Sequence, residues 1–486
     1  MSLSASDVGV PRCAVLLALL GVASCAINPA TGQRQLSLVG EAQEVEMGRT
    51  YAQEINRTMP HYDDAGLQAY VDGIGQSLAM TSERPELPWA FTVLDDPVVN
   101  AFAIPGGFIY VTRGILTHFN SEAELAAVLG HEIGHVTARH SVEQMSRAQL
   151  GGLLLGVGSI VSEDVRRFGG LAQTGLGVLF LRYGRDDERE ADRLGVRYAV
   201  RDNYDPREAI GVHQTLGRLT EERGSSGVPS WLATHPPSED RIERIEAELA
   251  ALPRSALDGR VEVDRYLRAV DGVTFGPNPR HGYFIGTRFV HPDMAFEFTF
   301  PDNWQTANLA QAVIGQSANQ DAIFQLTVES AEYGAAADAF FRQDGMVREA
   351  VGRTTMNGQA AITGRFRAQT EQGEIVGQVT FVEHGDGSYR LLGYTTPSRW
   401  TAYDDEFQRI TRSFRRLTES AILRVQPLRL ELLRVPRSVT LAEMASDRAL
   451  PIDLEALAVV NGVSADETLE AGTTIKWVVG EPPPGL

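Results

Sequence analysis

His131-Glu132-Ile133-Gly134-His135 is the stretch that decides how this part of the chain folds, because it lies where the sequence signals a helix. Ser121 fits the N-cap position with Glu124 three residues later, and an apolar run follows. On a helix, histidines four residues apart project from one face, so both imidazoles can reach one tetrahedral Zn²⁺. Glu132 sits beside them and suits a general base that takes a proton from water, not a metal ligand.

Two further observations favour a metal site over surface histidines on a polar helix face. The chain has 10 His among 486 residues, and at that frequency chance produces the H-E-x-x-H pattern only about 0.013 times. Gly134 also costs the helix about 1 kcal/mol relative to Ala. We therefore expect another segment to pack closely against that turn.

A catalytic zinc ion needs a third protein ligand, and an acidic run downstream supplies candidates. The run is Asp186-Asp187-Glu188-Arg189-Glu190-Ala191-Asp192. H-E-x-x-H followed by E-x-x-A-D resembles the M48 metallopeptidases, the family of the CAAX prenyl proteases and the HtpX-type proteases. The resemblance implies a mainly helical zincin-type domain in which Glu188 is the third zinc ligand and Asp192 fixes a ligand imidazole. The alternative is a solvated helix face.

The remaining candidates are sorted by helix geometry and local sequence. Glu190 is turned by about 200° from Glu188 on a helix, so we do not expect it to address the metal. His235 lies in a Pro-rich turn that suits a loop over the zinc, where it would take the fourth position or stabilise the oxyanion. The alternative is a loop histidine without a role. We expect structural roles for His118 and His140, and surface positions for His281, His291 and His384.

Three more segments resemble exported bacterial members of the family. They are residues 28–32 (NPATG), 100–107 (NAFAIPGG) and 234–242 (THPPSEDRI), and the similarity covers about residues 28–250. Gly106-Gly107 lies between two strand-like runs, which predicts a β-hairpin. The hairpin edge is either a place where an extended substrate pairs or an ordinary edge.

The amino-terminal sequence predicts export. Arg12 precedes an apolar run over residues 14–23, which has signal-peptide length and is too short to span a bilayer. The run ends in Val22-Ala23-Ser24-Cys25, which resembles the bacterial lipobox, so we expect residues 1–24 to be removed and Cys25 to be lipidated. An ordinary signal peptide with a coincidental cysteine is the alternative. Ala26, by resemblance to Gram-negative lipoproteins, points to the outer membrane and its periplasmic face.

Composition indicates an α+β protein with several domains. Residues 25–250 form the metallopeptidase domain, and residues 251–285 are a connector. Two glycine-rich apolar stretches inside the first domain, 150–161 and 171–181, are too short to span a membrane, so we expect a membrane-surface or core helical hairpin.

The last two domains carry no catalytic motif. Residues 286–420 show alternating strand patterns and resemble, weakly, the mixed α/β PsbP-like fold. Residues 421–486 resemble a degenerate LysM module, a β-α-α-β unit that binds glycan. Peptidoglycan is therefore a candidate partner, and a structural cap is the alternative.

Together these patterns predict a zinc-dependent endopeptidase exported as a lipoprotein. Its substrates are expected to be misfolded or misassembled envelope proteins, by family analogy only. The formal net charge of −19 makes nucleic acid an unfavourable partner. The alternative is a peptidoglycan-tethered scaffold or chaperone with a gated or vestigial protease domain. The presence of Glu132 favours the enzyme.

Overall fold

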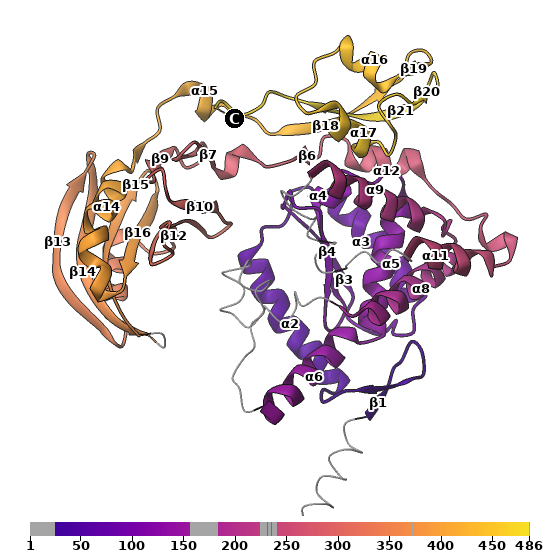
Figure 1. Ribbon diagram of the computed structural model, residues 1–486, viewed down its shortest axis with the longest axis horizontal. Helices are drawn as coiled ribbons and strands as arrows, with labels where there is room; N and C mark the ends of the chain where they lie inside the picture. The colour runs from indigo at the N-terminus through magenta and orange to yellow at the C-terminus, as the bar shows by residue number, and fades with distance from the viewer. Residues whose placement is uncertain are drawn as a thin grey trace, which may run out of the picture. The chain divides into compact units, whose positions relative to one another are not determined.

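The computed structural model describes residues 25–155, 183–223, 231, 235, 241–370 and 373–485, which divide into two units (Figure 1). The first unit comprises Met1–Val273 and Leu430–Val478, and the second Thr274–Arg429 and Val479–Leu486. The predicted signal peptide and residues 156–161 and 171–181 of the two apolar stretches lie outside the described residues. Within the described ranges, no helix is both long and apolar enough to cross a membrane.

The first unit is mainly helical around a small sheet. An antiparallel pair, β1 (Cys25–Ile27) and β2 (Arg34–Leu36), precedes it. The range predicted as a connector contains a helix, α12 (Val263–Val270). The other elements before residue 273 are α2 (Glu41–Thr58), α3 (Ala65–Met80), β3 (Ala90–Leu94), β4 (Ala101–Ile104), β5 (Phe108–Thr112), α4 (Arg113–Leu116), α5 (Glu122–Thr137), α6 (His140–Leu155), α8 (Arg185–Arg201), α9 (Glu208–Arg223), α11 (Arg241–Ala250) and the 3₁₀ turn η4 (Arg254–Ala256).

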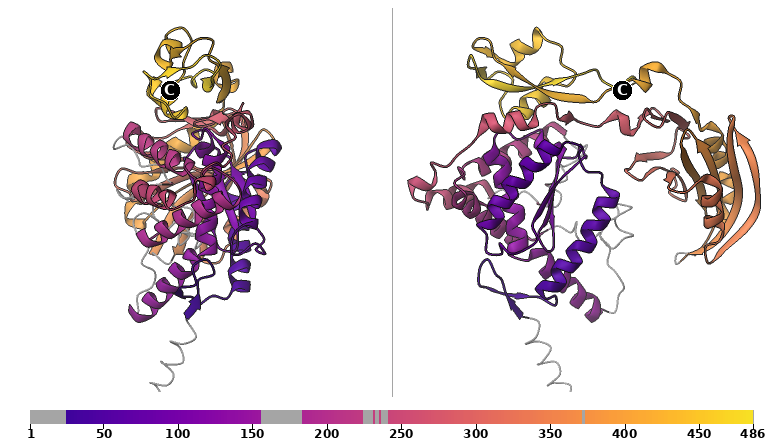
Figure 2. Two further views of the ribbon diagram at one scale, coloured as in Figure 1. Left: turned by 90° about the vertical axis from the view of Figure 1, so that its right-hand side faces the viewer. Right: turned by 180° about the vertical axis from the view of Figure 1, so that it is seen from behind.

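The sheet of the first unit has the order β3-β5-β4 and contains the predicted hairpin. Strands β4 and β5 are antiparallel, with Ala103 opposite Ile109. The turn between them holds Gly106 and Gly107 at φ +84° and +99°, a backbone conformation that favours glycine. Helix α2 lies on one side of the sheet, and α3 and α5 lie on the other (Figures 1 and 2). Strand β4 is therefore an edge strand next to α5.

Helix α5 is almost entirely buried, and glycines allow α8 to pack closely against it. Every residue of α5 except Ala127 is buried. A Cβ on Gly134 would lie 3.1 Å from the Cα and O atoms of Ala191 in α8, and a Cβ on Gly195 would lie 3.0 Å from the backbone nitrogen of His131. The close packing predicted at Gly134 is confirmed, and α8 is the segment that supplies it.

The chain returns to the first unit at Leu430. Its N–H donates to the carbonyl of Val273 and its carbonyl accepts from Gly272, both at 2.9 Å. The two ends of the intervening second unit therefore start from neighbouring residues. The predicted β-α-α-β order is present, with β19 antiparallel to β20. The elements of this segment are β18 (Leu428–Arg434), β19 (Val439–Thr440), α16 (Leu441–Ser446), α17 (Leu454–Val460), β20 (Thr468–Leu469) and β21 (Thr474–Val479).

Lys476 fixes this C-terminal segment to the start of helix α5. Its side chain is fully buried, and its Nζ donates to the carbonyls of Thr117 at 2.9 Å and Phe119 at 2.6 Å. Arg218 in α9 donates to the carbonyls of residues 462 and 463, both at 3.1 Å. The C-terminal segment is thus packed into the unit that carries the H-E-x-x-H helix.

The second unit is built on a seven-stranded antiparallel sheet in the order β10-β11-β12-β16-β15-β14-β13. The long strands β13 to β16 curve, and α13 and α14 pack against the sheet (Figure 2). A second sheet has the order β17-β9-β8-β7. The elements are β6 (Thr274–Phe275), η5 (Pro279–His281), β7 (Tyr283–Ile285), β8 (Arg288–His291), β9 (Phe296–Thr299), β10 (Gln305–Asn308), β11 (Ala312–Gln316), β12 (Ala322–Glu329), α13 (Tyr333–Phe341), β13 (Met346–Met356), β14 (Gln359–Thr370), β15 (Gly373–His384), β16 (Gly387–Thr395), η6 (Pro397–Arg399), α14 (Trp400–Ser413), β17 (Arg415–Arg416) and α15 (Ser420–Leu423).

Aromatic side chains fill the core of the second unit, among them Phe298, Phe324 and Phe407. The surface position predicted for His384 is wrong, because this residue is only 7% exposed. His291, predicted at the surface as well, is only partly exposed. The Nε2 atom of His384 lies 3.1 Å and 3.0 Å from the carbonyls of residues 294 and 295. The imidazole therefore bonds to backbone carbonyls inside the fold instead of facing solvent.

Candidate metal centre

Helix α5 begins with the predicted cap and carries both histidines of the motif. Ser121 Oγ accepts a hydrogen bond from the N–H of Glu124 at 3.1 Å, and the Glu124 carboxylate accepts from the N–H of Asn120. His131 and His135 lie one turn apart, with their Nε2 atoms 3.0 Å from each other. The capped helix thus directs both imidazoles toward one point.

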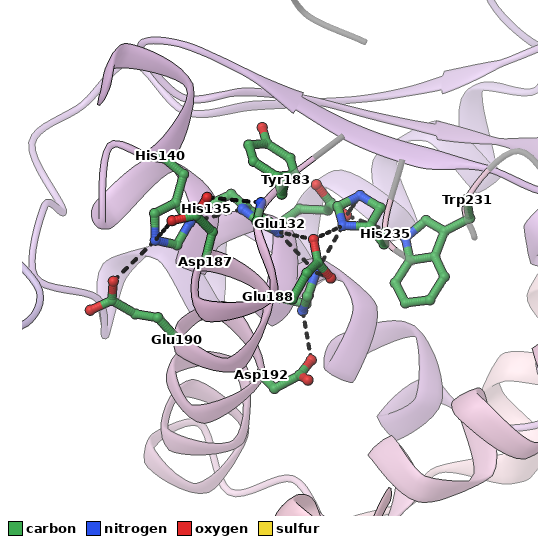
Figure 3. A network of polar contacts seen from close by, with 12 residues as sticks. Glu132, His135, His140, Tyr183, Asp187, Glu188, Glu190, Asp192, Trp231 and His235 are labelled. Carbon is green, nitrogen blue, oxygen red and sulfur yellow. Dashed lines mark hydrogen bonds and ion pairs between the residues drawn. The ribbon is translucent and has the colours of Figure 1, made fainter. Parts of the chain in front are cut away.

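Four buried side chains converge at that point, those of His131, His135, Glu188 and His235. Figure 3 shows the last three of them beside one another. The Oε1 atom of Glu188 on α8 lies 2.8 Å from His235 Nδ1 and 3.5 Å from His135 Nε2, and its Oε2 lies 3.6 Å from His131 Nε2. Each of the four side chains offers a ligand atom within 4.8 Å of the others. Each residue is at most 4% exposed. The structure therefore brings together the three predicted ligands and His235.

Asp192 lies behind His131, one turn after Glu188 on α8. Its Oδ1 is 2.9 Å from His131 Nδ1, and Arg241 donates to both carboxylate oxygens at 2.7 Å. Burial alone would raise the pKa of Asp192, but Arg241 and His131 outweigh it and hold that pKa below its usual value. An ionised Asp192 accepts from His131 Nδ1–H and leaves Nε2 free to face the cluster.

His135 has a different neighbour on its outer side. Its Nδ1 lies 2.9 Å from Nδ1 of His140 on α6, and the Tyr183 ring stacks on it with centroids 3.9 Å apart. The other nitrogen of His140, Nε2, lies 3.1 Å from Glu190 Oε2. Glu190 does not reach the cluster, as its position on α8 predicts, but it reaches His140. The structural role predicted for His140 stays a prediction, and its contacts join His135 to Glu190.

Glu132 is the fully buried acid of the site. Trp231 Nε1 donates to its Oε1 at 3.4 Å, and His235 Nε2 lies 3.5 Å from the same oxygen. Among the described residues, its Oε2 has no hydrogen-bond partner. Burial raises the pKa of Glu132, although His235 and His131 act in the opposite direction. A carboxylate held in this way is suited to accept a proton.

The donor set fits a metal ion. Burial lowers the pKa of His135 well below its usual value, and the neighbouring His131, His140, His235 and Arg241 lower it further. Its imidazole is therefore neutral at neutral pH, as metal binding requires. Two nitrogen lone pairs repel each other at the 3.0 Å that separates the two Nε2 atoms, and a shared cation relieves that repulsion. Imidazole nitrogens with a carboxylate oxygen are ligands of catalytic zinc sites.

Sequence reasoning missed Trp231, which holds His235, and Arg241, which packs against Trp231 and pairs with Glu188 at 3.0 Å. The Trp231 ring stacks on His235 with centroids 4.9 Å apart, and the Arg241 guanidinium lies 5.3 Å from the Trp231 ring centroid. Arg241 belongs to the segment 234–242 that resembles the family, which was the available signal. No comparable signal marked Trp231.

His118 lies just after α4, where its Nδ1 contacts the carbonyl of Gly114 at 2.8 Å.

Part of the chain is similar to curated metalloproteases. The mitochondrial metalloendopeptidase OMA1 of Arabidopsis thaliana is 34% identical over 213 residues, which cover 42% of this chain and 42% of that protein. The beta-barrel assembly-enhancing protease of Escherichia coli (strain K12) is 30% identical over 224 residues, or 44% of this chain and 45% of that protein. The chain thus covers less than half the length of these relatives.

Solved structures resemble the chain only faintly. The cyanobacterial PsbP from Synechocystis sp. PCC 6803 matches 27% of this chain and 94% of its own, with 14% identity and a TM-score of 0.23. LpqN of Mycobacterium tuberculosis matches 25% of this chain and 83% of its own, with 10% identity and a TM-score of 0.21. These scores are too low to assign a fold, so the PsbP-like interpretation of residues 286–420 stays a prediction.

The family resemblance is confirmed for the part of the chain that carries the cluster. Helix α5, with the H-E-x-x-H motif, and helix α8, with Glu188, both lie within residues 66–249, the range that matches a family model. Residues 66–249 match the family described as Peptidase family M48, which supports a metallopeptidase in this part of the chain.

Proposed function

We propose that the protein is a zinc-dependent endopeptidase of the bacterial cell envelope. One observation carries the proposal: the ligand atoms of His131, His135 and Glu188 converge in a buried cluster with Glu132 directly beside it. These are the ligand types and the number of protein ligands that a catalytic zinc ion requires.

Each step of the proposed reaction has a candidate residue in the site. His131, His135 and Glu188 would hold Zn²⁺, which lowers the pKa of water toward neutrality and polarises the scissile carbonyl. His235 lies within the ligand set, with Nδ1 3.3 Å from His131 Nε2. From that position His235 would fill the place that the attacking water takes, so it would have to move aside before the water binds. Trp231 orients Glu132 by donating to its Oε1 at 3.4 Å.

Glu132 is the general base of the proposed reaction. Its burial raises the affinity of the carboxylate for a proton, so it takes the proton of the attacking water and then passes it to the leaving amine. The unpartnered Oε2 is the oxygen that is free to accept this proton. A vestigial domain has no need to keep this acid in place beside three ligands, which supports the enzyme over the scaffold or chaperone alternative.

The substrate proposal rests on the edge strand and on the relatives. Strand β4 lies at the edge of its sheet next to α5. Its four residues are buried, so an extended peptide would add there as a further strand only once this edge is uncovered. One relative is named a beta-barrel assembly-enhancing protease. We therefore place the substrates among misfolded or misassembled envelope proteins.

The proposed location follows from the amino terminus. We propose export, cleavage before Cys25, and lipid anchoring on the periplasmic face of the outer membrane. Cys25→Ser is expected to abolish fatty-acid labelling and to release the protein from membranes. A variant that stays in the membrane fraction contradicts the anchor.

Peptidoglycan binding through residues 421–486 is a separate proposal. It rests on the β-α-α-β order of the C-terminal segment. Sedimentation of the full chain with purified peptidoglycan tests it. A protein that stays in the supernatant favours the structural cap.

The peptidase itself is tested by pairing metal analysis with cleavage. Purified wild type is expected to hold one Zn²⁺ and to cleave casein or unfolded envelope proteins. Glu132→Gln is expected to keep the zinc and lose nearly all cleavage, because the ligands remain and the base is gone. Glu143→Gln on α6 is the matched control and is expected to behave as wild type. A Glu132→Gln variant that cleaves at near wild-type rate would contradict the assignment of Glu132 as the general base.

A further inference from the structure

The two ligand histidines are each held from behind by an acid of the same helix. His131 Nδ1 contacts Asp192 directly at 2.9 Å. His135 Nδ1 contacts His140 at 2.9 Å, and His140 contacts Glu190 at 3.1 Å. Figure 3 shows Glu190 and Asp192 leaving α8 on opposite sides, with His140 meeting Glu190. His131 thus contacts its acid directly, whereas His135 is connected to its acid through His140.

The contacts of His140 decide which nitrogen of His135 carries a proton. An ionised Glu190 only accepts, so His140 donates from Nε2. With that proton on Nε2, the Nδ1 atom of His140 is placed to accept from Nδ1–H of His135, 2.9 Å away. His135 is left with its lone pair on Nε2, the atom that faces Glu188 and His131. Acting through His140, the Glu190 carboxylate therefore favours the tautomer of His135 that binds a metal through Nε2.

Glu190 is itself held by the turn that follows Cys25, the proposed lipidation residue. Asn28 is only 5% exposed, and its Nδ2 lies 3.5 Å from Glu190 Oε2. The Thr31 side chain also hydrogen-bonds Glu190. Asn28 Oδ1 accepts from the N–H groups of residues 30 and 31 at 2.9 Å and 3.2 Å, which fixes the turn between β1 and β2. Cys25 begins β1, three residues before Asn28.

We propose that His140 and Glu190 are positioning residues for the metal ligand His135, and that the turn at residues 28–31 holds Glu190 in place for this purpose. This inference rests on the proposed zinc peptidase. It gives the N-P-A-T-G segment a defined role: the residues next to the anchor support one ligand of the metal centre. Neither His140 nor Glu190 touches the reacting atoms.

Replacement of His140 distinguishes positioning from simple packing. His140→Ala removes the acceptor for His135 and is expected to weaken Zn²⁺ affinity by about 10–100-fold. His140→Gln is expected to restore most of that affinity, because its amide oxygen accepts from His135 while its NH₂ group donates to Glu190. A role in packing alone would not be rescued by an amide of different shape.

The experiment uses the full-length protein and three readouts. Zn²⁺ affinity is measured by competition with a chromogenic chelator, the ligand field by the visible spectrum of the Co²⁺-loaded protein, and the fold by circular dichroism. Glu190→Ala, expected to weaken Zn²⁺ binding on the order of 10-fold, keeps the test decisive if His140→Ala does not fold. Asp186→Asn at the exposed start of α8 is the matched control and is expected to leave all three readouts unchanged.

The outcomes separate the two proposals. Unchanged zinc affinity and cobalt spectrum in His140→Ala or Glu190→Ala overturn the positioning role while leaving the zinc peptidase intact. A His140→Gln variant as weak as His140→Ala also overturns it. A folded wild type that binds no zinc overturns the proposed function itself.

Discussion

Gly134→Ala tests whether the contact between α5 and α8 sets the geometry of the metal centre. The added Cβ would lie 3.1 Å from the Cα and O atoms of Ala191 and 3.2 Å from the Cβ of Leu194. Two of these three atoms are backbone, so they cannot rotate away, and α8 must shift by a few tenths of an ångström. The same helix carries Glu188, so the shift is transmitted to the cluster.

Two opposing effects determine how much Gly134→Ala changes the free energy of unfolding. Replacing a helical glycine with alanine stabilises a helix by about 1 kcal/mol. Overpacking a tight interface costs about 1–3 kcal/mol, so we expect a net loss in the free energy of unfolding of up to about 2 kcal/mol. Gly73 in α3 provides the matched control, because its Cβ would meet nothing within 4 Å. Gly73→Ala is therefore expected to show the stabilisation alone.

The assay is urea unfolding of both variants beside Zn²⁺ affinity. Gly134→Ala is expected to be less stable than Gly73→Ala and to bind zinc several-fold more weakly, because ligand geometry is sensitive to displacements well below 1 Å. If Gly134→Ala is as stable as Gly73→Ala and binds zinc like wild type, the helix contact does not set the ligand geometry.

Three further changes have defined outcomes. Asp192→Asn is expected to weaken Zn²⁺ affinity by about 10–100-fold in a chelator competition, since a neutral amide oxygen is a weaker acceptor for His131 Nδ1–H than a carboxylate; wild-type affinity would contradict this. Lys476→Ala leaves the carbonyls of Thr117 and Phe119 without their donor and should lower the free energy of unfolding by about 2–5 kcal/mol in a urea titration, whereas a detachable module predicts no change. Burial lowers the pKa of His291 from 6.5 to about 4, so the unfolded state binds the proton more readily. Stability present above pH 6.5 is then lost as the pH falls to 4, by about 3 kcal/mol, and His291→Gln should flatten this slope.

Local patterns were sufficient for the helix that carries the motif and for the hairpin beside it. The Ser121 cap and the spacing of His131 and His135 are properties of a few consecutive residues, and a single helix fixes their geometry. Gly134 was informative for the same reason, because an unfavourable residue inside a helix indicates close packing without revealing its partner. Glu188 and Asp192 required the family resemblance.

The missed features depend on contacts between distant parts of the chain. His140 and Glu190 are 50 residues apart in sequence, and Lys476 contacts Thr117 across 359 residues. No local periodicity encodes such a pairing. His384 was assigned to the surface because no partner spacing was visible, yet its partners are backbone carbonyls, which every residue carries and which no sequence pattern marks.

The hydrogen bonds between Leu430 and residues 272–273 have a consequence for how the protein can change. They place the exit and the return of the chain side by side, so residues 274–429 are a cassette inserted into the first unit. A cassette with adjacent ends can be lengthened, replaced or removed by recombination at two points while the ligands of the metal centre keep their positions. Selection could therefore alter this cassette separately from the chemistry, and a short turn joining residues 273 and 430 is the direct route to engineering a minimal peptidase.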